Sequence, residues 1–318
     1  VLFCRFARCG GGGSGLDHVG CHNGVIAWSQ FEDLGANAIQ VKGGSSHIRI
    51  QWNRITNAGE RGINMGGSTG FAYFRPPLPH AGGSVESKNI LVFSNLFEGS
   101  ATPVAFVGTV NSRVEHNTLV NPDRWLMRIL QETTTLNGID FLPCSSNTFA
   151  GNLVYYDYSR LRTHLNIGSN TAPETFVFSS NLWYAHDDPS RSRPFLPAAE
   201  TSGVYGQDPE LAWPGQGDYR INNQSPARGL GPTPAPVFRD YRGLAYENPP
   251  AAGAFEAPGT CPADLDRNGV LDQADLALFS GEMGRTRRPV YSLDPDLDLD
   301  GKDIALFARH MAGTGCID

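Results

Sequence analysis

Residues 264–275 carry oxygen-bearing side chains at the spacing of a calcium-binding loop. The segment reads D-L-D-R-N-G-V-L-D-Q-A-D, and its loop positions 1, 3, 5, 9 and 12 are Asp264, Asp266, Asn268, Asp272 and Asp275. Gly269 stands at position 6, where such a loop turns sharply, and Ca²⁺ prefers about six to eight oxygen ligands at this stagger. The alternative is an ordinary acidic surface turn, but all five ligand positions and the glycine match. The segment therefore predicts a Ca²⁺ site.

A second copy of the pattern follows at residues 296–307. Asp296, Asp298, Asp300 and Gly301 repeat the acidic start, and D-I-A-L-F from Asp303 repeats D-L-A-L-F from Asp275. In this alignment the second copy lacks four residues between the glycine and the last aspartate. Its candidate ligands are Asp296, Asp298, Asp300 and Asp303.

Cys261 and Cys316 bracket the duplicated unit. A unit of this size buries little core, so we expect a bound metal and a disulfide to stabilise it. The segment 261–318 resembles a type I dockerin repeat of secreted bacterial proteins. The resemblance implies Ca²⁺ as cofactor, an extracellular or cell-surface location and a cohesin-like or cell-surface partner. A terminal anchoring or assembly module is the alternative.

The composition limits the rest of the chain. The 318 residues include 37 glycines and 22 prolines and only 18% charged residues, which favours turn-rich β structure. A net charge of −7 argues against a nucleic-acid-binding surface, and no apolar run is long enough to span a membrane. The chain begins with Val and shows no signal peptide, so we read it as a mature or trimmed sequence. Cys4, Cys9 and Cys21 lie close in sequence and their pairing stays open, whereas Cys144 has no evident partner.

An asparagine-punctuated repeat must position any chemistry before residue 258. Short apolar-x-apolar pairs are followed by an asparagine, and an earlier copy has Gln30 in that place; the asparagines are Asn53, Asn95, Asn117, Asn152 and Asn181. A basic step of 22 or 23 residues with insertions is the signature of a solenoid. Stacked asparagines can hydrogen-bond along such a ladder. The fold expected is all-β, a right-handed parallel β-helix (solenoid) over residues 1–257, followed by a small α-helical calcium-loop module over 258–318.

A second strand follows each asparagine by about ten residues. The expected segments are 38–42, 62–66, 104–108, 126–130 and 164–168. The two-residue period of a strand places alternate side chains inward. The outward column is then expected to contain Gln40, Asn64, Phe106, Arg128 and Asn166.

Residues 208–257 read as a closing segment, with D-P-E-L, G-D-Y-R-I-N-N-Q-S-P-A-R-G-L-G, R-D-Y-R-G and A-G-A-F-E in order. Together with the repeat, this tail resembles secreted bacterial parallel β-helix proteins, including relatives of the chondroitinase B and alginate lyase group. The resemblance spans roughly residues 1–257. It implies the fold and an activity of the polysaccharide lyase type.

β-Elimination requires a base for the proton next to a uronate carboxylate and a cation to stabilise the enolate. Lys42, Arg61, Arg128 and His164 are the candidates for these roles, with Glu132 beside them. The alternative for Arg128 and Glu132 is a surface ion pair. Whether the chain is an enzyme stays open at this point.

Candidate ligand-binding residues lie in the outward column and in an insertion at about 67–88. Phe71 and Tyr73 offer flat faces to sugar rings, and Arg75 offers a carboxylate clamp. A loop that packs its own aromatic residues is the alternative. The full candidate set for substrate binding is Gln40, Asn64, Phe71, Tyr73, Arg75, Phe106, Trp125 and Asn166. The function expected is a secreted carbohydrate-active protein that binds, and as a lyase would cleave, an acidic polysaccharide. The alternative is a non-catalytic extracellular glycan-binding or structural protein.

Overall fold

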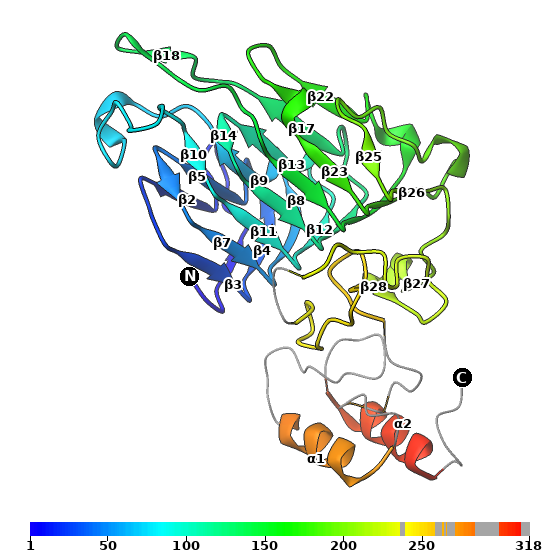
Figure 1. Ribbon diagram of the computed structural model, residues 1–318. Coiled ribbons are helices and arrows are strands. Elements are labelled where there is room, and N and C mark those ends of the chain that lie inside the picture. Colours follow the sequence, from blue (N-terminus) through cyan, green and yellow to red (C-terminus); the bar gives the residue numbers. More distant parts are fainter. Residues whose placement is uncertain (236–238, 258–262, 264, 266–270, 284–298, 313–318) are drawn as a thin grey trace.

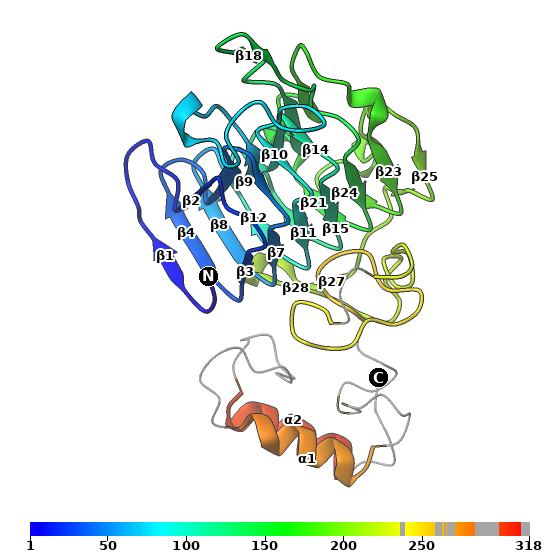
Figure 2. The ribbon, with the colours of Figure 1, turned by 60° about the vertical axis from the view of Figure 1, so that its left-hand side comes forward.

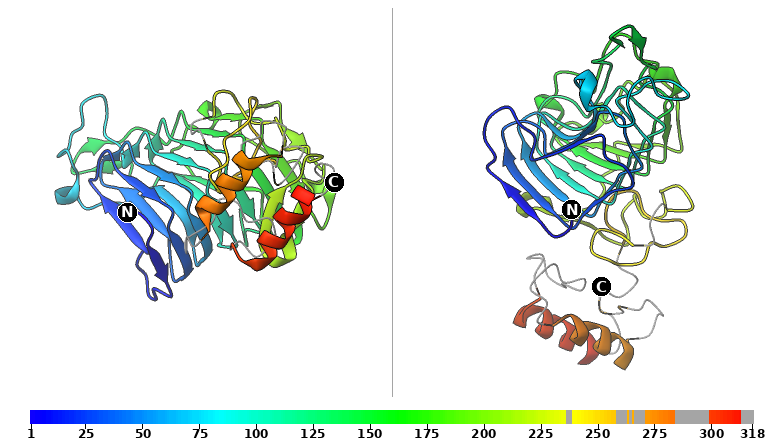
Figure 3. Two further views of the ribbon diagram at one scale, coloured as in Figure 1. Left: turned by 90° about the horizontal axis from the view of Figure 1, so that it is seen from below. Right: turned by 90° about the vertical axis from the view of Figure 1, so that its left-hand side faces the viewer.

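In the part of the chain that the structure describes, three long sheets of parallel strands enclose one apolar core (Figure 1). The computed structural model describes residues 1–235, 239–257, 263, 265, 271–283 and 299–312. The chain visits the three sheets in turn, so each strand pairs with strands of the preceding and following coils (Figure 3). This arrangement is compatible with the parallel β-helix expected from the repeat.

Each long sheet is named here by its first and last strands in chain order. The β3–β25 sheet consists of β3 (Val25–Ala27), β7 (Arg49–Gln51), β11 (Leu91–Phe93), β15 (Arg113–Glu115), β20 (Thr148–Ala150), β23 (Val177–Ser179) and β25 (Glu200–Thr201). The β1–β26 sheet consists of β1 (Arg5–Ala7), β4 (Gln30–Leu34), β8 (Arg54–Ala58), β12 (Leu96–Glu98), β16 (Thr118–Val120), β21 (Leu153–Tyr156), β24 (Leu182–Ala185) and β26 (Val204–Tyr205). The β2–β22 sheet consists of β2 (Leu16–Val19), β5 (Ile39–Lys42), β9 (Arg61–Gly66), β13 (Thr102–Val107), β17 (Met127–Leu130) and β22 (Leu165–Ile167).

Smaller elements decorate this stack. A short parallel sheet joins β6 (Ser45–Ser46), β10 (Ser87–Lys88) and β14 (Thr109–Val110). The two antiparallel hairpins are β18 (Thr135–Leu136) with β19 (Ile139–Asp140), and β27 (Leu211–Trp213) with β28 (Asp218–Ile221). Single 3₁₀ turns are η1 (Phe71–Tyr73), η2 (Tyr158–Arg160), η3 (Pro173–Thr175), η4 (Pro189–Arg191) and η5 (Pro214–Gln216). Within the described residues the two α-helices are α1 (Gln273–Glu282) and α2 (Gly301–Ala312). None of the helices described is long and apolar enough to cross a membrane.

The predicted asparagine ladder is present and buried. The Oδ1 atom of Asn95 accepts hydrogen bonds from both the backbone N–H and the Nδ2 of Asn53, at 2.9 and 3.0 Å. The same pair of bonds recurs at every following step, through Asn117 and Asn152 to Asn181. The ladder ends at Glu200, whose carboxylate accepts from Asn181 Nδ2 at 2.7 Å. The asparagines therefore satisfy the backbone donors of a buried turn, a structural role that needs no ligand.

The expectation that Gln30 occupies the first position of the ladder is wrong. Ser29, not Gln30, occupies it, because the Ser29 backbone N–H donates to Asn53 Oδ1 at 3.0 Å. Gln30 instead begins β4 and pairs with Arg54 of β8. The hydroxyl of Ser29 takes over the acceptor role at this coil, since it receives the backbone N–H of Cys4.

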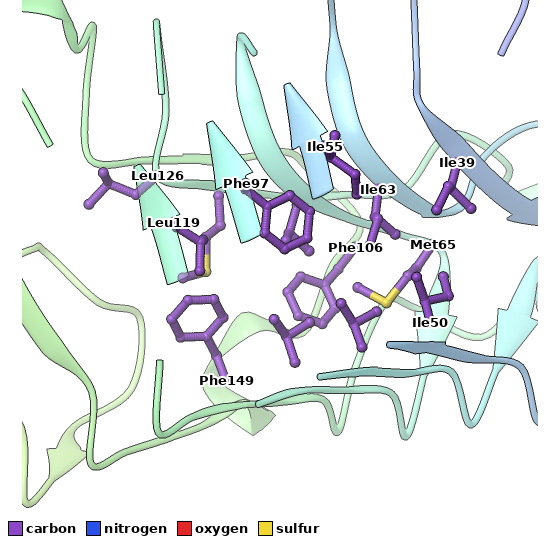
Figure 4. Packing of buried hydrophobic residues seen from close by; sticks show 14 of the residues in the cluster. Ile39, Ile50, Ile55, Ile63, Met65, Phe97, Phe106, Leu119, Leu126 and Phe149 are labelled. Carbon is purple, nitrogen blue, oxygen red and sulfur yellow. The ribbon is translucent and has the colours of Figure 1, made fainter. Parts of the chain in front are cut away.

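The expected strand at 104–108 is present, but its expected register is wrong. Phe106 pairs with Met65 and Ile129 on the neighbouring coils and is fully buried in the core (Figure 4). Ala105 takes the outward place, in register with Asn64 and Arg128. A shift of one residue exchanges the two faces of a strand, and this register places the large aromatic ring in the core and the small residue on the opposite face. Phe106 therefore contacts the core and not a ligand.

The closing segment folds back onto the turns of the asparagine ladder. Trp52 Nε1 donates to the Arg239 carbonyl at 3.1 Å, and the hydroxyls of Ser94 and Tyr246 lie 2.7 Å apart. His116 Nδ1 lies 2.9 Å from the carbonyl oxygen of Ala251, which identifies it as the donor. The described tail residues therefore cover the edge of the coils where the buried asparagines lie.

The two α-helices repeat one local arrangement. The Asp272 carboxylate caps α1 by accepting from Ala274 N at 2.7 Å, and Asp275 accepts from Asp272 N at 2.9 Å. Asp300 accepts from Lys302 N at 2.7 Å, and Asp303 accepts from Asp300 N at 2.9 Å. Asp300 thus occupies the place of Asp272.

This equivalence corrects the alignment that gave the second copy four missing residues. In that alignment Gly301 matched Gly269, whereas the geometry places Gly301 at the first residue of α2, as Gln273 is in α1. Phe279 and Phe307 stack across the two helices with ring centroids 4.5 Å apart. The repeat of the sequence is therefore a repeat of structure in its helical part.

Four cysteines are free in the described part of the chain: Cys4, Cys9, Cys21 and Cys144. The open question of pairing among the first three is therefore answered in the negative for this structure. Cys144 is fully buried in the core, and burial raises the pKa of its thiol to about 12. The bracketing cysteines, Cys261 and Cys316, lie outside the described residues.

Candidate functional site

On the outer face of the β2–β22 sheet, one residue from each strand lies in register with the next, and most of these residues are polar. The residues in register are Asp17, Gln40, Asn64, Ala105, Arg128 and Asn166. Strand pairing fixes this register. Each residue of the column therefore lies one strand spacing, about 4.8 Å, from the next. All the outward residues expected from the sequence are in place except Phe106.

Arg128 is the most strongly oriented cation of this column. Its guanidinium carbon lies 4.5 Å from the ring centroid of Trp125, and its Nε donates to Asn166 Oδ1 at 2.9 Å. Burial and the neighbouring Arg61 charge lower the pKa of Arg128 below its usual value, which still leaves the group charged. The terminal nitrogens have no hydrogen-bond partner within the described part of the chain. A stacked guanidinium whose terminal Nη1–Nη2 edge is open is suited to a carboxylate or sulfate.

Arg61 and Glu132 lie beside Arg128 and neutralise each other. Arg61 Nη2 is 2.9 Å from Glu132 Oε1, and Arg61 Nη1 donates to Asn64 Oδ1 at 2.8 Å. The Arg61 side chain is only 11% exposed, and its Nε is buried without a partner among the residues described. These contacts fix Arg61 as a support for the column.

Lys42 lies away from this cluster. Its Nζ is 3.5 Å from Asp17 Oδ2, toward the first coil. Its strand β5 is three strand spacings, about 14 Å, from β17 and Arg128. The structure therefore does not bring Lys42 and Arg128 to one reacting atom. Gln40, beside Lys42, is held by Ser14 and Asn37 and donates to the Gly66 carbonyl.

His164 also lies apart, because its ring turns into an aromatic pocket. The ring contacts Tyr156, Tyr158 and Phe195, with centroids 5.5 to 6.2 Å away. The side chain is buried, and burial lowers the pKa of His164. Its Nε2 is 3.4 Å from the Arg191 carbonyl oxygen. A histidine in this environment packs the end of the coil and does not face the column.

The insertion at 67–88 divides into packed and exposed parts. Phe74 is fully buried and meets Phe141 edge-on at 5.5 Å, whereas Phe71 and Tyr73 are 42% and 67% exposed. Arg75 Nη1 donates to the carbonyls of Ala72 and Phe74, so this guanidinium supports its own loop. Phe74 therefore packs as the alternative expects, whereas ligand binding by the exposed Phe71 and Tyr73 stays a prediction.

Glu86 is the residue of this region that sequence reasoning missed. Its buried carboxylate accepts hydrogen bonds from Thr69 N, Thr69 Oγ1, Gly43 N and Thr133 Oγ1, at 2.7 to 3.3 Å. Burial raises the pKa of Glu86, and the threonine hydrogen bonds oppose that rise. The clamp joins the insertion to the loop that carries Glu132. A single glutamate among small residues was the only signal in the sequence.

The calcium prediction falls mostly on residues that the structure does not describe. Asp264, Asp266, Asn268, Asp296 and Asp298 lie outside the described residues, whereas Asp272, Asp275, Asp300 and Asp303 lie within them. Asp275 and Asp303 are fully buried, and their oxygens accept backbone N–H groups. An all-oxygen donor set fits a hard cation such as Ca²⁺. The described residues alone contain no group of three or more His, Cys, Asp or Glu side chains able to hold a metal.

Comparison with known proteins does not identify the chain. No protein-family model matches it, and a search of curated proteins finds no relative.

Proposed function

We propose that the parallel-sheet body binds an acidic polysaccharide on the outer face of the β2–β22 sheet. The observation that carries the proposal is the oriented Arg128, held between the Trp125 ring and Asn166. The stack on Trp125 and the hydrogen bond that Nε donates already restrict the Arg128 side chain, so anion binding costs less rotamer entropy. The open edge formed by Nη1 and Nη2 of this planar guanidinium matches a carboxylate or sulfate in a bidentate fashion.

Aromatic side chains at Arg128 and on the insertion favour a sugar ligand over a small anion. Trp125 offers an aromatic surface at the cation, and Phe71 and Tyr73 are exposed on the insertion. Aromatic faces pack against the C–H surfaces of sugar rings, while amides such as Asn166 exchange hydrogen bonds with hydroxyls. A ligand that lies along the column meets one such coil about every 4.8 Å. This geometry suits an elongated chain with anionic groups.

Binding is a better supported function than β-elimination. An elimination site needs a base and an enolate-stabilising cation within reach of one carbon atom. Lys42 is paired with Asp17 about 14 Å from Arg128, and His164 is packed among aromatic rings. Glu132 is hydrogen-bonded to Arg61, which disfavours proton abstraction by its carboxylate. The proposal is therefore a non-catalytic glycan-binding body.

The C-terminal module supplies the proposed location. Ca²⁺ binding by 264–275 and by the second acidic segment would hold the two helices together, outside the cell where Ca²⁺ is abundant. A module of this kind would attach the glycan-binding body to a cohesin-like or other cell-surface partner. The sequence pattern and the repeated capping geometry of Asp272 and Asp300 support this part.

Titration calorimetry with acidic hexasaccharides tests the proposal. Arg128→Ala is expected to weaken binding at least about tenfold, or 1.4 kcal/mol. Arg5→Ala is the matched control, because it removes an exposed arginine on β1 whose partner is Glu32. Equal affinities of wild type and Arg128→Ala would overturn the proposed site. Ultraviolet absorbance of an unsaturated product, measured on the same samples, would reveal a lyase and overturn the non-catalytic assignment.

A further inference from the structure

A second groove lies on a different sheet from the proposed site. It has a volume of about 530 Å³ and runs over the outer face of β3, β7, β11 and β15, which lie side by side in Figure 2. Its floor is formed by the first residue of each strand, in register from coil to coil: Val25, Arg49, Leu91 and Arg113. We call this the β3–β15 groove. None of the candidate residues considered so far lines it.

The floor alternates between apolar and cationic side chains. Val25 and Leu91 are apolar, and Arg49 and Arg113 follow each of them in the stacking direction. The two arginines are two strand spacings apart, about 10 Å along the stack. This separation is comparable to the length of one disaccharide in an extended glycan. A chain with one anionic group per disaccharide would therefore meet a guanidinium at each repeat and an apolar floor between.

One wall of the groove is a ladder of polar turn residues. Asn23, His47, Asn89 and Asn111 precede the strands, and all four adopt a positive φ of 54 to 57°. Asparagine tolerates this left-handed conformation better than most residues, which explains its repeated use here. His47 Nε2 lies 3.1 Å from Asn89 Nδ2, so the ladder is partly linked within itself. The amides of its three asparagines line the groove and can exchange hydrogen bonds with sugar hydroxyls.

The charges of the groove favour an anionic occupant. Arg49 is exposed and has no ion pair among the residues described. Arg113 is oriented by Glu115, whose two carboxylate oxygens accept from Nε and Nη2 at 2.8 Å each. The Glu115 side chain is only 4% exposed and that of Arg113 is 47% exposed, so the arginine dominates the exposed surface of this pair. No acidic side chain lines the groove itself.

We propose that the β3–β15 groove binds an acidic polysaccharide that carries one anionic group per disaccharide and lies along the stacking direction. Arg49 is the main anchor, Arg113 receives the next anionic group, and Leu91 packs against the sugar between them. The ligand class rests on the proposed function, but the groove and its residues are independent of Arg128. Two glycan sites on different sheets would allow one protein to bridge two polysaccharide chains. Where one network of chains reaches both sites, the second binding step gains from a high effective concentration.

The experiment isolates the groove in the Arg128→Ala background. The probes are a hyaluronan hexasaccharide, with one carboxylate per disaccharide, and a hexagalacturonate, with one on every sugar. Arg49→Glu is expected to weaken hyaluronan hexasaccharide binding at least tenfold in this background, while Arg5→Ala leaves it unchanged. Leu91→Glu should have the same effect as Arg49→Glu, because it places a carboxylate in the floor. The alternating probe should bind the groove more tightly than the hexagalacturonate.

The outcomes separate the two sites. If Arg49→Glu and Leu91→Glu leave both affinities unchanged in the Arg128→Ala background, the groove proposal fails, and a loss of affinity from wild type to Arg128→Ala keeps the Arg128 site. If Arg128→Ala has no effect in the wild-type background while Arg49→Glu abolishes binding, the groove stands and the proposed function loses its site. A failure of wild type to bind either probe overturns both. Concentration-dependent dimerisation that Arg49→Glu removes would assign the groove to a second copy of this chain and overturn the glycan proposal. Unchanged melting temperatures of the variants establish that folding is intact.

Discussion

Arg61 of β9 and Glu132 of the loop after β17 form an ion pair 2.9 Å long above the outer face of the β2–β22 sheet. The pair is held to the outward column, because Arg61 Nη1 also donates to Asn64 Oδ1 at 2.8 Å. It also sets the electrostatics beside Arg128, because Glu132 attracts and Arg61 repels the same guanidinium. The net charge at the proposed site is therefore smaller than the number of arginines suggests.

Removing the Glu132 charge should strengthen binding of acidic ligands. Glu132→Gln keeps a side chain of nearly the same shape but leaves two arginines uncompensated. We expect affinity for an acidic hexasaccharide to rise about three- to tenfold at low salt and this gain to shrink at high salt. Stability should fall by about 1 kcal/mol, because the pair is only partly exposed. Calorimetry at two salt concentrations measures the effect, and a weaker affinity at both would contradict the prediction.

The shape of the cation at residue 128 should matter beyond its charge. Arg128→Lys keeps the positive charge but loses the planar fork, the stack on Trp125 and the geometry of the bond to Asn166. We expect affinity for acidic hexasaccharides to fall about tenfold, close to the loss in Arg128→Ala. Trp125→Leu is the companion variant, since it removes the ring and keeps an apolar side chain. If lysine at position 128 restores full affinity, simple charge attraction accounts for binding.

The asparagine ladder should be the most sensitive part of the coil stack. Asn117 Oδ1 accepts two hydrogen bonds from Asn95, and its Nδ2 donates to Val92 O, Glu115 O and Asn152 Oδ1. Asn117→Ala leaves these buried groups without partners, which costs about 1 to 3 kcal/mol for each group that stays unsatisfied. We expect a fall in unfolding free energy of several kcal/mol by denaturant titration. Asn121→Ala, at an incompletely buried turn, is the control, and an equally small loss in both would contradict the ladder's role.

Sequence reasoning recovered the ladder and most of the outward column because both follow from periodicity. The asparagines recur at one position of each coil, and Gln40, Asn64, Arg128 and Asn166 are in register as expected. Phe106 failed because the alternation in T-P-V-A-F-V is compatible with either face. Burial of the phenylalanine ring decided it in favour of the core.

Convergence of distant residues was not predictable in the same way. The strand pattern places Lys42 and His164 on the same sheet surface. In the structure Lys42 pairs with Asp17, whereas the His164 ring packs among aromatic rings. Partner choice depends on loop conformation and not on period. The β3–β15 groove was missed because its polar wall consists of turn residues, which the strand pattern treats as spacers.

The closing tail should make stability depend on pH through Glu256. Burial raises the pKa of Glu256 to about 7, from 4.5 in the unfolded chain. The folded state then holds a proton that the unfolded state has released, so this contribution is fully present below about pH 4.5 and is lost as pH rises through 7. His116 acts with the opposite sign, because burial lowers its pKa to about 4 and stability is lost as pH falls below 6.5. The two effects oppose each other between these limits.

The variant Glu256→Gln separates the two groups. Its amide oxygen can still accept from the backbone N–H of Ala251, as Oε2 of Glu256 does, but the side chain cannot titrate and it loses the second oxygen, which accepts from Ala257 N. The wild type should lose more melting temperature than Glu256→Gln between pH 5 and pH 8, with a difference of a few degrees. Parallel melting profiles of the two proteins would show that Glu256 does not keep its proton in the folded state.

Removal of Ca²⁺ should unfold the helical module and spare the sheets. The helices α1 and α2 meet through a small apolar cluster that includes Phe279 and Phe307, too little core for independent stability. A chelator should therefore abolish the helical circular dichroism signal and expose the module to protease, while the sheet transition keeps its midpoint. Asp275→Asn and Asp303→Asn are matched variants, because both carboxylates are fully buried and accept the backbone N–H three residues earlier. If both halves bind metal, each variant should raise the Ca²⁺ concentration at which the helical signal reaches half of its maximum. A helical signal that is the same with chelator and with excess Ca²⁺ would exclude calcium as the stabilising ligand.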